Sequence, residues 1–269
     1  MITGFLHPGA MGATIASACR GTRVWASEGR SAASAERASV AAIDDVGTVA
    51  ALVAEADTII SVRPPAAAHD VAREVADLGF DGLYVDANAV SPTTAREIGR
   101  PFTRFVDGGI IGPPVAQAGT TRLYLAGDGA SDVAERWADS ALEVRIIDAE
   151  PGAASAVKSG FAAWTKGTSA LLLAVRAYAE AEGVSADLIG EWQTSMPDLV
   201  ARSEHTAAGV GPKAWRFGGE MEEIADAFAA VGLPAGFHQA AALVYDSLHA
   251  FKDATPPPLL DEVIDTLLG

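Results

Sequence analysis

The chain has 269 residues, of which 49% are hydrophobic and 20% are charged, so it can bury one large core or two modest ones. Its formal net charge of −16 argues against binding to nucleic acid or to an anionic membrane, because both would be repelled. The single cysteine excludes an intramolecular disulfide and a cysteine-based metal site, and no other spacing suggests a metal. With neither a signal-peptide pattern nor an apolar run of about 20 residues, the chain is expected to be cytoplasmic.

The first half of the chain alternates short apolar runs with helical segments. Strands are predicted at Ile2–Leu6, Thr22–Ala26, Thr58–Val62, Gly82–Val85, Arg104–Val106, Leu123–Ala126 and Val144–Ile147. Helices are predicted at Met11–Arg20, Ala32–Val40, Ala66–Leu78 and Pro92–Ile98. Strands separated by helices indicate parallel β-α-β units.

The second half has a helical period and few β-branched clusters. One uninterrupted pattern runs from Gly152 to Gly183, and others cover Ala186–Arg202, Ala214–Val231, Ala235–Phe251 and Leu259–Leu268. The sequence therefore predicts an α/β fold: a Rossmann-type doubly wound sheet in residues 1–150, followed by an all-α domain in residues 151–269.

A glycine-containing turn follows the first predicted strand. The segment His7-Pro8-Gly9-Ala10-Met11-Gly12 joins that strand to a helix, where a dinucleotide pyrophosphate meets the first amides of the helix. The usual G-x-G-x-x-G has become H-x-G-x-x-G, with His7 in place of the turn glycine. A purely structural turn is the alternative, but the surrounding β-α-β pattern favours dinucleotide binding.

Four motifs in order resemble the β-hydroxyacid dehydrogenase superfamily, which includes 6-phosphogluconate and 3-hydroxyisobutyrate dehydrogenases and imine reductases. Gly4–Gly12 is similar to the family's G-F-I-G-L-G-x-M-G, and Val85–Pro92 to its V-D-x-S-T-V-S-P. Val106–Gly112 is similar to its D-A-P-V-S-G substrate loop, and Gly152–Lys158 to the G-x-x-x-x-x-K that begins its interdomain helix. A branch with its own C-terminal helical domain looks most similar.

The turn after the second strand bears on the choice of cofactor. Ser27, Arg30 and Ser31 offer hydroxyls and a guanidinium suited to the 2′-phosphate of NADP, whereas Glu28 could instead bind an NAD ribose. NADP is therefore expected, with NAD possible. Val62 and Arg63, at the end of TIISV, and Asn88 are further candidate cofactor contacts.

Lys158 lies in the small and apolar stretch AASAVKSGFAAW, where a lysine is costly to bury unless it is paired or used. The resemblance implies that it is the general acid/base, which gives a proton to the substrate oxygen as hydride leaves the nicotinamide. A helix lysine that reaches to solvent is the alternative.

Two polar groups of the resembling family are missing. Its usual asparagine one turn after the lysine is Ala162 here, and its substrate-loop serine is Ile111, next to Gly112. The substrate is then less polar, or other residues bind it. Candidates besides Ile111 and Gly112 are Ser91, which could equally be a helix N-cap, Trp164 and His238.

These observations predict an NADP-preferring oxidoreductase that acts on a small hydroxy or keto substrate. The alternatives are a reductase of an imine or a natural-product intermediate, and a non-catalytic NADP-binding protein. The Ala-rich helical half carries more apolar surface than a small bundle covers, and the resembling family pairs through this domain, so a homodimer is expected.

Overall fold

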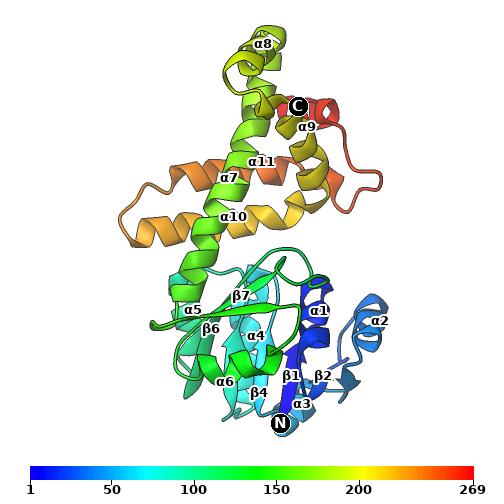
Figure 1. Ribbon diagram of the computed structural model, residues 1–269, viewed down its shortest axis with the longest axis vertical. Helices are drawn as coiled ribbons and strands as arrows, with labels where there is room; N and C mark the ends of the chain where they lie inside the picture. The colour runs from blue at the N-terminus through cyan, green and yellow to red at the C-terminus, as the bar shows by residue number, and fades with distance from the viewer. The chain divides into compact units, whose positions relative to one another are not determined.

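The first half of the chain forms one eight-stranded sheet in the computed structural model, which describes all 269 residues (Figure 1). The strand order is β3-β2-β1-β4-β5-β6-β7-β8. Its strands are β1 (Ile2–Leu6), β2 (Thr22–Trp25), β3 (Asp44–Asp45), β4 (Thr58–Ser61), β5 (Leu83–Asp86), β6 (Arg104–Ile111), β7 (Arg122–Ala126) and β8 (Glu143–Ile147). The order of connection reverses between β1 and β4, which is the switch point of a doubly wound sheet. The predicted Rossmann-type architecture is confirmed.

Helices cover both faces of this sheet, because its strands carry apolar residues on both sides. Phe5 and Leu6 are neighbours in β1, yet they belong to two separate core clusters, as expected when successive side chains point to opposite faces. The helices are α1 (Ala10–Ala18), α2 (Ala32–Val40), α3 (Val49–Glu55), α4 (Ala68–Asp77), α5 (Pro92–Gly99) and α6 (Ala130–Ala134), with short 3₁₀ turns η1 (Pro65–Ala67) and η2 (Glu135–Trp137).

The sheet differs from the expected run of parallel units at β6 and β7, which pair antiparallel, with Gly109 opposite Tyr124. The short elements β3, α3 and α6 were also not predicted. They are too short to show a clear period in the sequence.

Strand β6 continues to Ile111, whereas the sequence predicted that it ends at Val106 and that a loop follows. A charge and two glycines normally weaken a strand. Here both glycines are tightly packed, and the packing at Gly109 leaves no room for a Cβ. A Cβ at Gly108 would lie 3.1 Å from the Cβ of Ala87, and one at Gly109 would lie 2.5 Å from the carbonyl oxygen of Ala154.

The second half of the chain is entirely helical, as predicted. It contains α7 (Ala153–Ala181), α8 (Ser185–Ser195), α9 (Asp198–Val210), α10 (Ala214–Ala230), α11 (Gly236–Ser247) and α12 (Leu260–Leu268), with short 3₁₀ turns η3 (Gly211–Lys213) and η4 (His249–Phe251). Residues of α7, α9, α10, α11 and α12 share one apolar core. No helix is both long enough and apolar enough to cross a membrane.

The single helix expected over Ala186–Arg202 is two helices. Helix α8 ends at Ser195 and α9 begins at Asp198. Pro197 separates them, because it has no N–H to donate and disfavours helical backbone at the preceding Met196.

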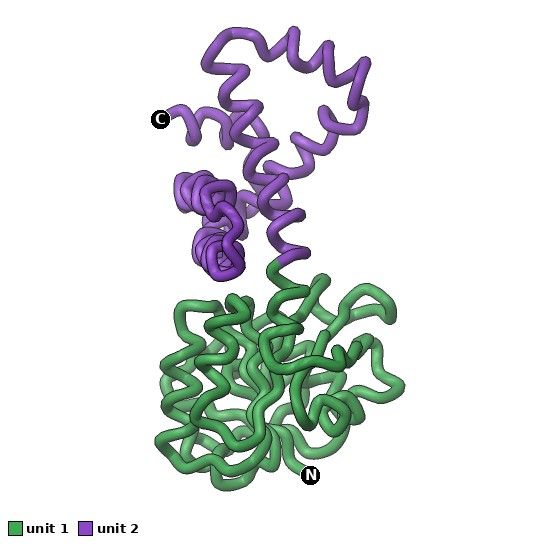
Figure 2. Tube along the Cα trace, turned by 90° about the vertical axis from the view of Figure 1, so that its left-hand side faces the viewer, with its two compact units in different colours: residues 1–159 green, residues 160–269 purple.

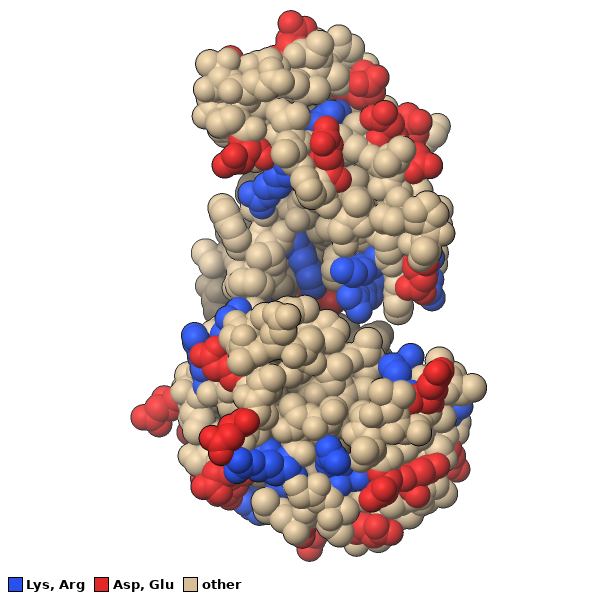
Figure 3. Space-filling view, turned by 45° about the vertical axis from the view of Figure 1, so that its right-hand side comes forward, with Lys and Arg blue, Asp and Glu red and all other residues tan.

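The chain divides into two compact units, residues 1–159 and 160–269 (Figure 2). The sequence placed the boundary at residue 150, before α7, whereas the division falls inside this helix. The first two turns of α7 belong to unit 1 because they pack on β6. Acidic side chains are spread over the surface of both units on the face shown in Figure 3.

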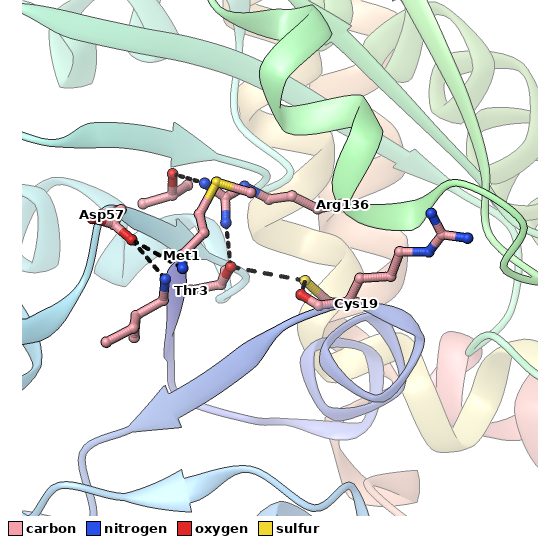
Figure 4. A network of polar contacts seen from close by, with 8 residues as sticks. Met1, Thr3, Cys19, Asp57 and Arg136 are labelled. Carbon is pink, nitrogen blue, oxygen red and sulfur yellow. Dashed lines mark hydrogen bonds and ion pairs between the residues drawn. The ribbon is translucent and has the colours of Figure 1, made fainter.

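A buried arginine joins three elements of unit 1 (Figure 4). Arg136 of η2 is 4% exposed and donates to the hydroxyl of Thr3 in β1 and to that of Thr58 in β4, both at 2.5 Å. Burial lowers the pKa of Arg136. Its hydrogen bonds go to two hydroxyls and not to a carboxylate. The guanidinium is therefore strongly hydrogen-bonded, but its buried charge is not neutralised by an ion pair.

We expect Arg136→Ala to lower the free energy of unfolding by about 2–4 kcal/mol, because it removes two charge-assisted hydrogen bonds and opens a cavity. Arg136→Met fills most of the volume without a buried charge and should lose less. Urea unfolding followed by circular dichroism measures both. Equal losses in the two variants would show that the hydrogen bonds, not packing, are responsible.

Candidate functional site

The turn between β1 and α1 forms a cradle at the switch point. Gly9 is the N-cap of α1, and neither a capping side chain nor an acidic residue occupies its first turn. A Cβ at Gly9 would meet no protein atom within 4 Å, so the space above this glycine is open. The amides of Ala10 and Met11 therefore remain available to an anion, as expected for a dinucleotide pyrophosphate.

At the second retained glycine, Gly12, a Cβ would stand at ordinary contact distance from its neighbours. A Cβ at Gly12 would lie 3.4 Å from the carbonyl oxygen of His7 and 3.5 Å from the Cβ of Val62. Helix α1 thus passes close to the ends of β1 and β4. The half-buried Val62 packs against the apolar core on that side of the sheet.

His7 adopts the left-handed backbone conformation that a glycine would supply, with φ of 66°. This conformation costs a residue with a Cβ about 1–2 kcal/mol. The position is therefore a true glycine position of the turn, and the histidine occupies it at a cost to stability.

The ends of β1, β4 and β5 meet around His7, Arg63 and Asn88. The imidazole Nε2 of His7 lies 2.7 Å from a terminal nitrogen of Arg63. The side-chain oxygen of Asn88 accepts from the backbone N–H of Arg63, and its amide nitrogen donates to the Ser61 hydroxyl at 3.1 Å. The structure brings these three predicted residues together, and Asn88 holds the backbone at the end of β4.

Electrostatics keep His7 uncharged. Burial, followed by the positive charges of Arg63 and Arg30, lowers its pKa to about 3. A guanidinium can only donate, so Nε2 of the neutral ring accepts the hydrogen bond from Arg63 and the proton lies on Nδ1.

The turn after β2 carries Ser27, Arg30 and Ser31. Ser31 is the N-cap of α2 and accepts from the backbone N–H of Ser34 at 3.3 Å. The backbone N–H of Ser27 donates to the Asp45 carboxylate at 3.2 Å, which shapes the turn. Burial lowers the pKa of the partly exposed Arg30.

Sequence reasoning missed a third arginine at this place. Arg37 of α2 donates to the carbonyl oxygen of Pro8 at 3.2 Å and to the Ser34 hydroxyl at 3.1 Å. It links the glycine turn to α2. In the sequence, only its position about one and a half turns after the Ser31 cap could have indicated that Arg37 lies near the glycine turn.

Asp107 joins β6 to the start of α7. Its carboxylate is fully buried and accepts from the backbone N–H groups of Gly152 (2.8 Å) and Ser155 (2.9 Å) and from the Ser155 hydroxyl (2.5 Å). Burial raises the pKa of Asp107 more than these hydrogen bonds lower it. The side chain satisfies the first amides of a 29-residue helix and lies at its positive end.

Lys158 lies two turns into α7, facing β6. Its ammonium donates to the carbonyl oxygen of Ile110 at 2.7 Å. A Cβ at Gly109 would lie 3.2 Å from the Cβ of Lys158, so this glycine permits the close approach of strand and helix. The side chain is partly exposed, and a backbone carbonyl accepts a hydrogen bond from its ammonium.

Three candidate substrate residues of unit 1 have structural roles. Ser91 is the N-cap of α5 and accepts from the backbone N–H of Thr94 at 3.1 Å, which agrees with the alternative stated for it. Ile111 is the last residue of β6, not part of a loop, and is buried. Gly112 has φ of 124°, and a Cβ there would collide with the Thr120 carbonyl.

Trp164 and His238 line the same cavity in unit 2. This cavity, of about 810 Å³, lies along α7, α10 and α11, and Leu171 and Phe237 also line it. His238 is buried in α11 and packs edge-on against Phe228, with ring centroids 4.4 Å apart. Burial lowers its pKa. The cavity is overwhelmingly apolar.

The other lysine of α7, Lys166, belongs to the core of unit 2. It pairs with Glu220 of α10, and its ammonium lies 4.4 Å from the Phe217 ring centroid. Ala162, which stands at the family's asparagine position, is buried in the same core. Neither position offers a polar group to a substrate.

The sheet order, the glycine turn and the helical second unit define a Rossmann-type fold followed by a helical C-terminal domain. A family model described as a domain of unknown function (DUF1932) matches residues 179–248, within unit 2. An uncharacterised 28.5 kDa protein of Methanothermus fervidus is 30% identical over 142 residues, which cover 51% of this chain and 54% of that protein. The match thus spans about half the length of this curated relative.

Solved structures match nearly the whole chain. A conserved protein of unknown function, whose structure is described as similar to 3-hydroxyacid dehydrogenases, is 27% identical over 93% of this chain and 98% of its own, with a TM-score of 0.70. The 3-hydroxyisobutyrate dehydrogenase of Mycobacterium tuberculosis, solved with L-serine, is 20% identical over 100% and 99%, with a TM-score of 0.70. An imine reductase of Bacillus cereus is 15% identical over 100% and 99%, with a TM-score of 0.55. The last two share the fold. The resemblance to the hydroxyacid dehydrogenases is confirmed.

We expect Asp107→Ala to lower the free energy of unfolding by about 2–4 kcal/mol, because the first amides of α7 lose a charged acceptor. Hydrogen exchange at Gly152 and Ser155 should accelerate with it. Asp107→Asn is the control, since it keeps an acceptor oxygen without the buried charge and should lose less than half as much. Unchanged exchange in Asp107→Ala would contradict the role of this contact.

Proposed function

We propose that this protein is an NAD(P)-dependent oxidoreductase that prefers NADP and transfers hydride between the nicotinamide and a small hydroxy or keto substrate. One observation carries the proposal: Lys158 and the open glycine turn lie in the same unit, and Asp107 and Gly109 hold the start of α7, with Lys158, against β6. The similarity to 3-hydroxyacid dehydrogenases supports an oxidoreductase.

Residues at the start of α1 and after β2 would bind the cofactor. The amides at the start of α1 and the open space over Gly9 bind the pyrophosphate, and the bound nicotinamide supplies or accepts hydride. Arg30 forms no ion pair with a carboxylate and would bind the 2′-phosphate. Ser27 and Ser31 shape its turn.

Lys158 would transfer the proton. In reduction its ammonium gives a proton to the substrate oxygen as the carbon receives hydride, and in oxidation the neutral amine takes this proton back. The carbonyl of Ile110 orients the ammonium through one of its three N–H groups. An ammonium held in this way is oriented for proton transfer to a substrate oxygen beside it.

A less polar substrate, such as a ketone without a carboxylate or a cyclic imine, is the second candidate. It is favoured by buried apolar side chains at Ile111 and Ala162, where the resembling family carries polar groups. Initial rates on hydroxyacids, simple ketones and cyclic imines with NADPH distinguish these classes. A protein that binds NADPH and turns over none of them would instead be a binding protein.

We also propose that two chains pair along α7. Five large apolar residues on this helix are exposed at spacings of four, three, seven and seven: Val157, Phe161, Trp164, Leu171 and Tyr178. This is the heptad pattern of a helix that packs against another helix. We call it the α7 seam. Trp164 and Leu171 of the seam also line the apolar cavity of unit 2, so a second chain would cover both.

Replacement of the lysine tests the proposed chemistry. Lys158→Ala should lower turnover by about 10²- to 10⁴-fold, the contribution of a positioned acid/base, and should remove one limb of the pH–rate profile. The dissociation constant of NADPH should change less than about twofold, because the cofactor contacts lie elsewhere. Lys158→Arg should not restore turnover, since a guanidinium does not release its proton near neutral pH.

The exposed Lys213 gives the matched control, and Lys213→Ala should keep wild-type turnover. If Lys158→Arg recovers most of the rate with the pH limb intact, the lysine orients the substrate by charge. Near-normal turnover in Lys158→Ala would remove it from the mechanism.

The α7 seam predicts a dimer of twice 27.5 kDa in light scattering. Trp164→Glu combined with Leu171→Glu should give a monomer, because both charges would be buried at the contact. Val40→Glu is the control, since Val40 is 84% exposed on α2 and lies outside the seam. A wild-type monomer at micromolar concentration would contradict the pairing.

A further inference from the structure

Two arginines at the cofactor site have no carboxylate partner. Arg30, after β2, and Arg63, after β4, take part in none of the ion pairs of the structure. Both are partly buried, and the charge of Arg30 is close enough to lower the pKa of Arg63. Glu74 acts in the opposite direction on both groups but lies beyond ion-pair distance. The two arginines therefore follow the carboxyl ends of the strands on either side of β1, at one edge of the sheet, and neither forms an ion pair.

His7 fixes one of these guanidiniums. Its Nε2 lies 2.7 Å from the Arg63 side chain, and the backbone N–H of Arg63 is held separately by Asn88. Both ends of Arg63 are therefore restrained. A long arginine side chain otherwise loses considerable rotamer freedom when a ligand orders it.

The residue that accepts the hydrogen bond from Arg63 determines how much positive charge the site keeps. A carboxylate at position 7 would orient Arg63 equally well but would cancel its charge. A glycine would leave the charge but release the side chain. A neutral imidazole orients the guanidinium and leaves the full positive charge for a ligand.

We infer that His7 is a positioning residue for Arg63, and that Arg63 and Arg30 together form a two-guanidinium site for a phosphomonoester dianion. The inference rests on the proposed function, in which that dianion is the 2′-phosphate of NADP. To the Arg30 contact of the proposed function, the inference adds Arg63 as a second arginine and His7 as the residue that orients it. The pyrophosphate of either cofactor is a diester held by the amides of α1, so this pair serves to select NADP over NAD.

The experiment compares ligands with and without the monoester. Dissociation constants are measured by calorimetry for NADPH and NADH, for 2′,5′-ADP and 5′-AMP, and for inorganic phosphate. Arg63→Gln should weaken NADPH and 2′,5′-ADP about 10- to 100-fold, which corresponds to a lost charge-assisted contact. NADH and 5′-AMP should change less than twofold. Inorganic phosphate should bind at least 100-fold more weakly than 2′,5′-ADP, since it lacks the nucleoside.

The role of His7 is tested by a double-mutant cycle. His7→Gly suits the left-handed backbone, so the variant should fold, and it should weaken NADPH about three- to tenfold with little effect on NADH. In the Arg63→Gln background the same substitution should have no further effect on NADPH. A simple change in the shape of the turn would instead weaken both cofactors equally in both backgrounds.

The results separate this inference from the proposed function. If neither NADPH nor NADH binds, the proposed function fails. If both bind but Arg63→Gln leaves their ratio unchanged, or if His7→Gly acts additively with it, the inference alone is overturned. Arg73→Gln is the control, because Arg73 is exposed on α4 beside Asp70, and its loss should leave the ratio unchanged.

Discussion

The contact between Asp107 and the first turn of α7 is the constraint on which the candidate site depends. A buried carboxylate in the middle of β6 satisfies amides that a helix cannot satisfy itself, and Gly109 lets the helix come against the strand. Together they fix where α7 begins and in which direction Lys158 points. Burial disfavours the carboxylate, so the contact is kept against an electrostatic cost.

Much of unit 1 could be predicted because its signals are local. Apolar runs between turn residues indicated the strands, and the glycine-containing turn after Ile2–Leu6 indicated where the first helix begins. The extent of β6 could not be predicted, because Gly108 and Gly109 look like a loop until Ala87 and Ala154 are placed beside them. The antiparallel pairing of β6 and β7 is likewise decided by neighbours, not by the pattern of either strand.

The same distinction holds for the site. Residues that end successive strands, such as His7, Arg63 and Asn88, could be predicted because parallel strands end at one edge. The roles of Asp107 and Arg37 depend on contacts between distant segments, so the motif that contains Asp107 and the position of Arg37 after the Ser31 cap did not reveal them. For Ser31 and Ser91, the residue type alone could not distinguish ligand binding from capping, and each caps a helix in the structure. A capping serine and a ligand-binding serine look alike in a sequence.

The backbone of His7 has a consequence for any attempt to make this protein more robust. Left-handed positions without glycine are among the first places where a stabilising substitution is sought, since glycine relieves the strain. A screen for thermal tolerance alone would therefore favour glycine at this position. The more durable protein would have lost the imidazole that contacts Arg63. If His7 positions Arg63 as we infer, selection for heat resistance and selection for cofactor choice would oppose each other at this single residue.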